Sequence, residues 1–181
     1  MRWPGITRPA RGGPDGFGPA VLPHLDAAYS LARWLVRDAT LAEDVVQDAV
    51  VRALAHFGTY HGGDARAWLL RIVRNAAYDA LAARKRAGGD SLGLAPDGLA
   101  AQVADPAEGP DAALDRHEDM AQLGLALAAL PDELRECLVM RELEDMSYKE
   151  IAIVAGVPVG TVMSRLWRAR RALSGHGGGR A

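Results

Sequence analysis

Basic side chains are concentrated near the end of the chain, in the segment GVPVGTVMSRLWRARRAL (156–173). Four arginines fall within positions 165–171, and no acidic residue follows Glu150. The whole chain has a formal net charge of −2, so this positive charge is a local feature. Guanidinium groups donate hydrogen bonds to phosphates and to base edges, and the segment is therefore suited to binding nucleic acid.

A helix-turn-helix is expected to position these arginines. Ser147 and Glu150 have the spacing of a capping box, Gly156 suits a helix C-terminus, and Pro158 suits the first turn of the next helix. Apolar residues then take one side of the second helix and polar residues the other. A basic face that is merely solvated is the alternative, but the turn and the segregated faces favour DNA binding. We expect the contacts from Lys149, Pro158, Gly160, Thr161, Ser164, Arg165, Arg168 and Arg171.

Composition favours an all-α protein, because β-branched and aromatic residues are scarce and the aromatic share is 6%. The length of 181 residues suits one domain or two small ones.

The single cysteine, Cys137, cannot form an internal disulfide and is expected to be a core residue. The N-terminal segment lacks the apolar stretch of a signal peptide, and no apolar run approaches a membrane span, so a cytoplasmic location is expected.

Helical periodicity divides the chain into two helical domains. Apolar residues recur every four positions from Leu41 to Phe57, and Thr40 with Glu43 predicts a capping box that starts this helix at Leu41. The linker holds five acidic residues and no basic one. The predicted organisation is a disordered extension over 1–19, a helical domain over 20–87, a flexible acidic linker over 88–111, a second helical domain over 112–174 and a flexible tail over 175–181.

Both domains resemble parts of a known family. Region four of bacterial sigma factors is similar to LPDELRECLVMRELEDMSYKEIAIVAGVPVGTVMSRLWRARRAL, and region two is similar to AEDVVQDAVVRAL followed by GDARAWLLRIVRNAAYDALAARKR. Because no region three lies between them, the chain resembles the extracytoplasmic-function (ECF) group of the sigma-70 class. The resemblance implies a sigma factor that binds core RNA polymerase and directs promoter-specific initiation. Region four would read the minus-35 element as duplex DNA, and region two would read and melt the minus-10 element.

The resemblance implies two further sites in the first domain. The helix with AEDVVQDAV matches the one that docks on the coiled coil of the polymerase β′ subunit, although the residues alone would also allow a solvated polar face. Its outer side carries Glu43, Asp44, Gln47, Asp48 and Arg52. The loop 58–64 and the next helix match the part that captures a flipped base of the minus-10 element. The candidates there are Tyr60, His61, Arg66, Arg71 and Asn75.

Partners and departures complete the prediction. The resemblance implies core RNA polymerase (its β and β′ subunits), promoter DNA and an anti-sigma factor as partners, without membrane insertion. No cofactor or metal is expected, because the five histidines are scattered and neither a Cys–His metal spacing nor a Gly-rich phosphate loop occurs.

Met163 stands where many members carry Lys or Arg, and Trp167 replaces a smaller aromatic residue or His. These two residues leave the promoter sequence open.

Three other functions compete with a non-enzymatic promoter-specificity subunit. The main alternative is a sigma-like adaptor that sequesters an anti-sigma protein and never initiates transcription. A stand-alone helix-turn-helix repressor would leave the first domain unexplained, and an enzyme has no supporting motif.

The acidic linker is expected either to mimic nucleic acid inside the polymerase or to act as a plain tether. The inducing signal, the identity of an anti-sigma factor, and whether residues 1–19 belong to the native protein stay open.

Overall fold

The structure of the protein, a computed structural model, describes residues 16–88 and 124–174. All regular secondary structure in these two ranges is helical, which confirms the all-α prediction. The predicted disordered extension up to residue 15, the linker from residue 89 and the tail from residue 175 lie outside the described residues. The same holds for the start of the second predicted domain, residues 112–123.

The first unit, residues 16–88, is a helical bundle. Its helices are α1 (Phe17–Val21), α2 (Leu25–Val36), α3 (Ala39–His56) and α4 (Ala65–Arg86). Helix α2 ends at Arg37, which has a left-handed backbone with φ 58° and donates its amide to the Arg33 carbonyl at 3.0 Å. The predicted four-residue spacing of apolar side chains fills the core, which includes Leu31, Leu35, Val45, Ala49, Ala53, Leu70, Val73 and Ala77.

Helix α3 begins two residues earlier than predicted. The predicted cap was Thr40 with a helix starting at Leu41, but the helix begins at Ala39. Asp38 is the N-cap, because its Oδ1 accepts the Leu41 amide hydrogen at 3.1 Å. A carboxylate at this position satisfies one of the orphan amide groups of the first turn and also favours the positive end of the helix dipole.

Helix α1 lies partly inside the segment predicted to be disordered. The prediction placed residues 1–19 in the extension, yet the helix starts at Phe17. The ring of Phe17 packs edge-on against the ring of Phe57, with 5.3 Å between the centroids. This aromatic contact packs the segment against the bundle. The Gly- and Pro-rich composition around Phe17 favoured a prediction of disorder instead of a helix.

The second unit, residues 124–174, contains the predicted helix-turn-helix. A helical turn over 124–129 precedes α6 (Asp132–Glu142), α7 (Tyr148–Ala155) and α8 (Val159–Ser174). The capping box of Ser147 and Glu150 is present, and Gly156 ends α7 with φ 68°, as predicted. Pro158 directly precedes α8, and its carbonyl accepts the amide hydrogens of Thr161 and Val162.

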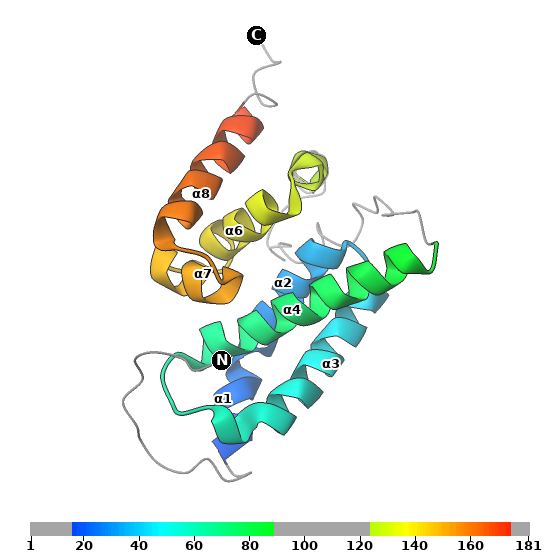
Figure 1. Cartoon of the computed structure of the whole chain (residues 1–181), viewed down its shortest axis with the longest axis vertical. Helices are drawn as coiled ribbons and strands as arrows, with labels where there is room; N and C mark the ends of the chain where they lie inside the picture. Colours follow the sequence, from blue (N-terminus) through cyan, green and yellow to red (C-terminus); the bar gives the residue numbers. More distant parts are fainter. Residues whose placement is uncertain (1–15, 89–123, 175–181) are drawn as a thin grey trace, which may run out of the picture.

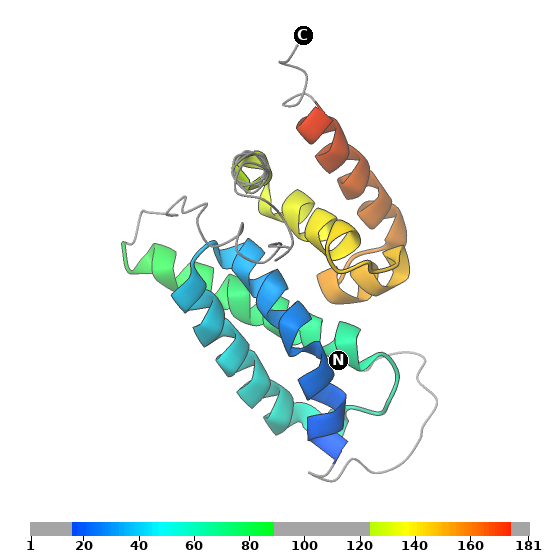
Figure 2. The same ribbon diagram turned by 180° about the vertical axis from the view of Figure 1, so that it is seen from behind.

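The two units pack against one another, with α7 against α4 and α6 against α2. Figures 1 and 2 show α6 and α7 between the first bundle and α8, so α8 lies on the far side of the second unit. Cys137 of α6 is fully buried, which confirms its prediction as a core residue. No single helix in the described part of the chain is long and apolar enough to cross a membrane, and only α7 and α8 taken together, bent by 100°, meet that length and composition.

Candidate nucleic-acid interface

Helix α8 has one buried face and one exposed basic face. Val162, Leu166 and Ala169 are buried against the rest of the second unit. The opposite face has no acidic residue in its sequence. Among the predicted contact residues of the motif, those that are exposed are Lys149, Pro158, Gly160, Ser164, Arg168 and Arg171. The arrangement presents hydrogen-bond donors and positive charge along one side of a helix, as a major-groove reader needs.

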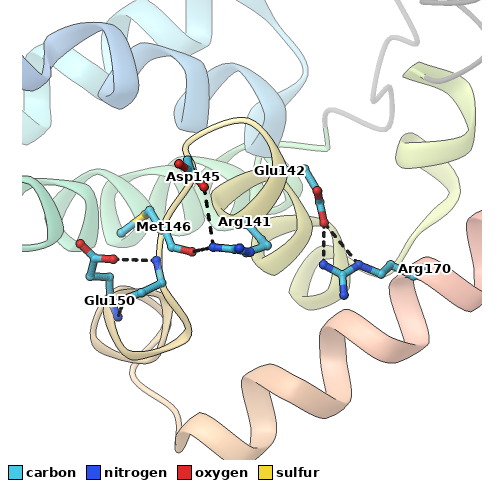
Figure 3. A network of polar contacts seen from close by, with 7 residues as sticks. Arg141, Glu142, Asp145, Met146, Glu150 and Arg170 are labelled. Atoms are coloured by element: carbon cyan, nitrogen blue, oxygen red, sulfur yellow. Dashed lines mark hydrogen bonds and ion pairs between the residues drawn. The ribbon is translucent and has the colours of Figure 1, made fainter.

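Polar contacts link α8 to α6 and lie in the loop before α7 (Figure 3). Arg170 of α8 contacts Glu142 of α6 with 2.7 Å between Nη2 and Oε1. In the loop after α6, Arg141 donates from Nη1 to the Met146 carbonyl at 2.8 Å, while Asp145 has a left-handed backbone with φ 49°. The loop between α6 and α7 therefore has polar contacts of its own, and one exposed ion pair links α6 to α8.

Arg165 differs from the other predicted contact residues. Its side chain is 16% exposed, and its Nη1 lies 3.2 Å from Glu136 Oε1 of α6. Thr161 is also only partly exposed, and its carbonyl accepts the Ser164 hydroxyl hydrogen at 2.9 Å. The structure thus gives Arg165 a partner inside its own unit, whereas Arg168 and Arg171 face solvent.

Glu136 is the centre of a buried polar cluster between the two units. This carboxylate is 0% exposed and accepts hydrogen bonds from Arg74 Nε at 2.7 Å and Arg74 Nη2 at 3.1 Å. The Tyr78 hydroxyl donates to Glu136 Oε2 at 3.0 Å, and Arg165 completes the set. Burial, together with the Glu136 charge, raises the pKa of Tyr78. Sequence reasoning missed both Glu136 and Arg74, and an acid inside the apolar run LRECLVM was the only available signal.

The predicted minus-10 residues fall into two groups. Arg66 Nη2 of α4 lies 2.6 Å from Glu144 Oε2 in the second unit, so this guanidinium is paired across the junction. The Tyr60 ring packs on Trp68 with 5.0 Å between centroids, and its hydroxyl donates to the Gly63 carbonyl at 2.9 Å. In contrast, His61 and Asn75 are exposed, and Arg71 is half-buried. The helices of the second unit therefore cover part of the face on which these residues lie.

The predicted polymerase-docking face of α3 is open to solvent. Glu43, Asp44, Gln47 and Asp48 are exposed. Arg52 is instead a bridge, with Nη2 2.7 Å from Asp48 Oδ2 and Nη1 2.7 Å from Asp79 Oδ2 of α4. Sequence reasoning missed two apolar neighbours on the same side, Val51 and Leu54, which are 65% and 54% exposed. Exposed apolar side chains next to acidic ones are typical of a protein-binding surface.

Metal-binding chemistry has no support in the described ranges, 16–88 and 124–174. These residues contain no group of three or more His, Cys, Asp or Glu side chains that could hold a metal ion. The buried thiol of Cys137 is poorly suited to nucleophilic chemistry, because burial raises its pKa to about 11. The surfaces described above are built from basic, acidic and apolar side chains.

Comparisons with known proteins identify the family of both helical units. Sigma-70 region 2 matches residues 20–87, and sigma-70 region 4 matches residues 120–173. The RNA polymerase sigma-H factor of Pseudomonas aeruginosa is 37% identical over 172 residues, which cover 93% of this chain and 89% of that protein. The ECF RNA polymerase sigma-E factor of Escherichia coli is 33% identical over 139 residues, covering 72% of this chain and 70% of that protein.

A solved structure supports the same conclusion. The sigma factor RpoE of Bartonella quintana, crystallised with the anti-sigma factor NepR, superposes with a TM-score of 0.72 at 28% identity. The match covers 92% of this chain and 99% of that chain, so it includes both helical units. With two sigma-70 regions in order, relatives above 30% identity and this shared fold, the chain belongs to the ECF group of sigma-70 RNA polymerase sigma factors.

Proposed function

We propose that α8 reads the minus-35 element of a promoter as duplex DNA while the chain is bound to core RNA polymerase. The observation that carries this proposal is the exposed face of α8, where Arg168 and Arg171 lie in solvent opposite a fully buried apolar face. Phosphates would be held by these arginines and by Lys149 at the start of α7. Ser164 and Gly160 stand at the first turns, where a recognition helix approaches the base edges.

The salt dependence of promoter binding tests this assignment. The holoenzyme first selects a specific duplex from a random DNA pool, and the affinity for that duplex is then measured at several salt concentrations. Arg168→Ala should weaken binding and reduce the slope of log K against log salt by about 0.9 if the contact is to a phosphate. Arg170→Ala is the matched control, because Arg170 lies on the same helix but is paired with Glu142. Equal salt slopes for the two variants and the wild type would refute the assignment.

The minus-10 element is assigned to the loop 58–64 and α4, through Tyr60, His61, Arg66, Arg71 and Asn75. The exposure of His61 and Asn75 supports contact with an unstacked base. Asn75→Ala should spare closed complexes and impair strand opening, which permanganate footprinting measures. A promoter mismatched across the minus-10 region should restore part of the opening, because the unstacking free energy is already supplied. Normal opening of duplex promoters would contradict this role.

Docking on the polymerase β′ subunit is assigned to the outer side of α3, with Arg52 bracing the face against α4. Asp44→Arg combined with Gln47→Ala changes two exposed side chains and should abolish co-purification with core polymerase. The fold should persist, because surface substitutions away from caps and cores change stability little. Glu133→Arg, a charge reversal at an exposed position of α6, is the control and should leave assembly unchanged.

The remaining parts of the proposal concern partners and setting. The chain acts without catalytic activity of its own, in the cytoplasm, with residues 20–87 and 112–174 as its promoter-reading domains and 88–111 as their linker. An anti-sigma factor is a further partner, in line with the NepR complex of the Bartonella protein. Transcription in vitro with purified core polymerase separates this function from that of an adaptor, which would bind an anti-sigma protein and yield no transcript.

A further inference from the structure

Three apolar side chains form a stripe on the reading helix. Val159, Met163 and Trp167 are spaced four residues apart on α8, which places them along one side of the helix. They are 38%, 54% and 60% exposed. Single exposed apolar residues are ordinary, but three in line on one helix face form a continuous apolar strip. This strip needs an explanation in terms of what α8 contacts.

The surroundings of the stripe select an anionic partner. Ser164, Arg168 and Arg171 are exposed on the face of α8 that adjoins the stripe, and no acid occurs after Glu150. The guanidinium carbon of Arg171 lies 5.2 Å from the centroid of the Trp167 ring, so a positive charge sits directly on the apolar strip. An apolar protein helix would have to desolvate these arginines without a counter-charge, whereas duplex DNA supplies phosphates to them.

The major groove of DNA offers one apolar group to such a strip. Each base pair presents donors and acceptors there, and thymine alone adds a C5-methyl group. Apolar side chains contact that methyl group in protein–DNA complexes. Because Met163 and Trp167 are one helical turn apart, they would meet methyl groups on neighbouring base pairs.

We propose that Met163 and Trp167 determine promoter specificity by contacting thymine C5-methyl groups in the minus-35 element. The inference rests on the proposed function of α8 and adds to it the class of base that these two positions select. Arg171 orients the Trp167 indole from one side, and Met163 supplies a flexible thioether that adapts to the methyl position.

The test replaces thymine by deoxyuridine, one position at a time, in a minus-35 duplex selected by the holoenzyme. This exchange removes only the methyl group and leaves pairing and charge unchanged. The wild-type chain should bind about threefold to fivefold more weakly at one or two positions, as expected for the burial of one methyl group. Met163→Gln should lose the sensitivity at one of these positions, and Trp167→Ala at the other.

The control is Ile153→Ala, which removes a side chain 45% exposed on α7 and should keep the full thymine-to-uracil ratio. Wild-type binding that is equal on thymine and deoxyuridine at every position would overturn the proposal and assign the strip to an apolar protein partner instead. Sensitivity that persists in both variants would overturn it as well. If the holoenzyme selected no specific duplex at all, the proposed function itself would fail, so the two failures are distinguishable.

Discussion

Replacement of Glu136 by glutamine is the sharpest test of how the two units are joined. The carboxylate is fully buried and neutralises Arg74 from the first unit and Arg165 from the second, while it also accepts the Tyr78 hydroxyl hydrogen. Glutamine keeps the size and one acceptor oxygen but removes the negative charge. Two guanidinium groups then remain near one another without a counter-charge, which is the costly half of breaking a buried ion pair.

The expected loss of unfolding free energy is about 2–3 kcal/mol. Removing one partner of a buried ion pair costs roughly 3–5 kcal/mol. We expect a loss at or below the lower end of this range, because the Arg74 and Arg165 side chains are 21% and 16% exposed, so water replaces part of the lost interaction. A loss of this size lowers the melting temperature by about 5–10 °C for a chain of this length. Urea denaturation followed by far-UV circular dichroism measures the free energy.

Glu142→Gln is the matched control, because its partner Arg170 and Glu142 itself are both about half exposed. Its effect should stay below about 1 kcal/mol, as for surface ion pairs in general. Small-angle X-ray scattering should show a larger radius of gyration for Glu136→Gln only, since Arg74 and Glu136 belong to different units. Equal stability and equal radius for the two variants would refute the role given to Glu136.

Three further predictions concern local features of the fold. Arg37→Gly should have an unfolding free energy about 1 kcal/mol higher than that of Arg37→Ala, because both variants lose the Arg37 side chain and its ion pair with Asp132, whereas only glycine relieves the left-handed backbone at φ 58°. Ser147→Ala should lower it by about 1 kcal/mol through loss of the capping box. The hydrogen bond from the Leu41 amide lowers the pKa of Asp38. The ionised carboxylate therefore contributes fully to the unfolding free energy above its unfolded-state pKa near 4, and this contribution is lost as pH falls through the lower folded-state pKa. Asp38→Asn should remove this part of the acid sensitivity.

Urea titrations at several pH values measure all three effects. Arg37→Ala, which keeps a Cβ atom at the strained position, is the reference for Arg37→Gly. Ser174→Ala, at the exposed end of α8, is the control for the capping serine. An Arg37→Gly variant no more stable than Arg37→Ala would contradict the backbone argument. An unchanged Ser147→Ala variant, or an Asp38→Asn variant with the wild-type pH profile, would contradict the corresponding argument in the same way.

Local signals predicted the helix-turn-helix well. The start of α7 follows from the spacing of Ser147 and Glu150, and its end from a glycine that accepts φ 68°. These features depend on residues within one turn of each other, so a single sequence contains all the necessary information. The predicted start of α3 was wrong, because Asp38 and Thr40 are both good caps and only the folded chain shows that Asp38 is used.

Contacts between the units could not be predicted from the sequence. Glu136 meets residues 62 and 58 positions away, and Arg66 meets a residue 78 positions away. No periodicity of charge or hydropathy specifies such pairs. Arg165 illustrates the result: its position on the helix suggested DNA contact, and only the structure shows that a buried acid already engages it.

The covering of α4 by the second unit has a thermodynamic consequence. A partner that needs this face binds only the fraction of molecules in which the units are apart, and its apparent affinity is reduced by that fraction. If the Glu136 cluster contributes about 2–3 kcal/mol to closure, its loss multiplies the open population by roughly 30–150 while that population is small. The buried carboxylate therefore sets a concentration threshold for any ligand that needs the covered part of α4, without contacting that ligand.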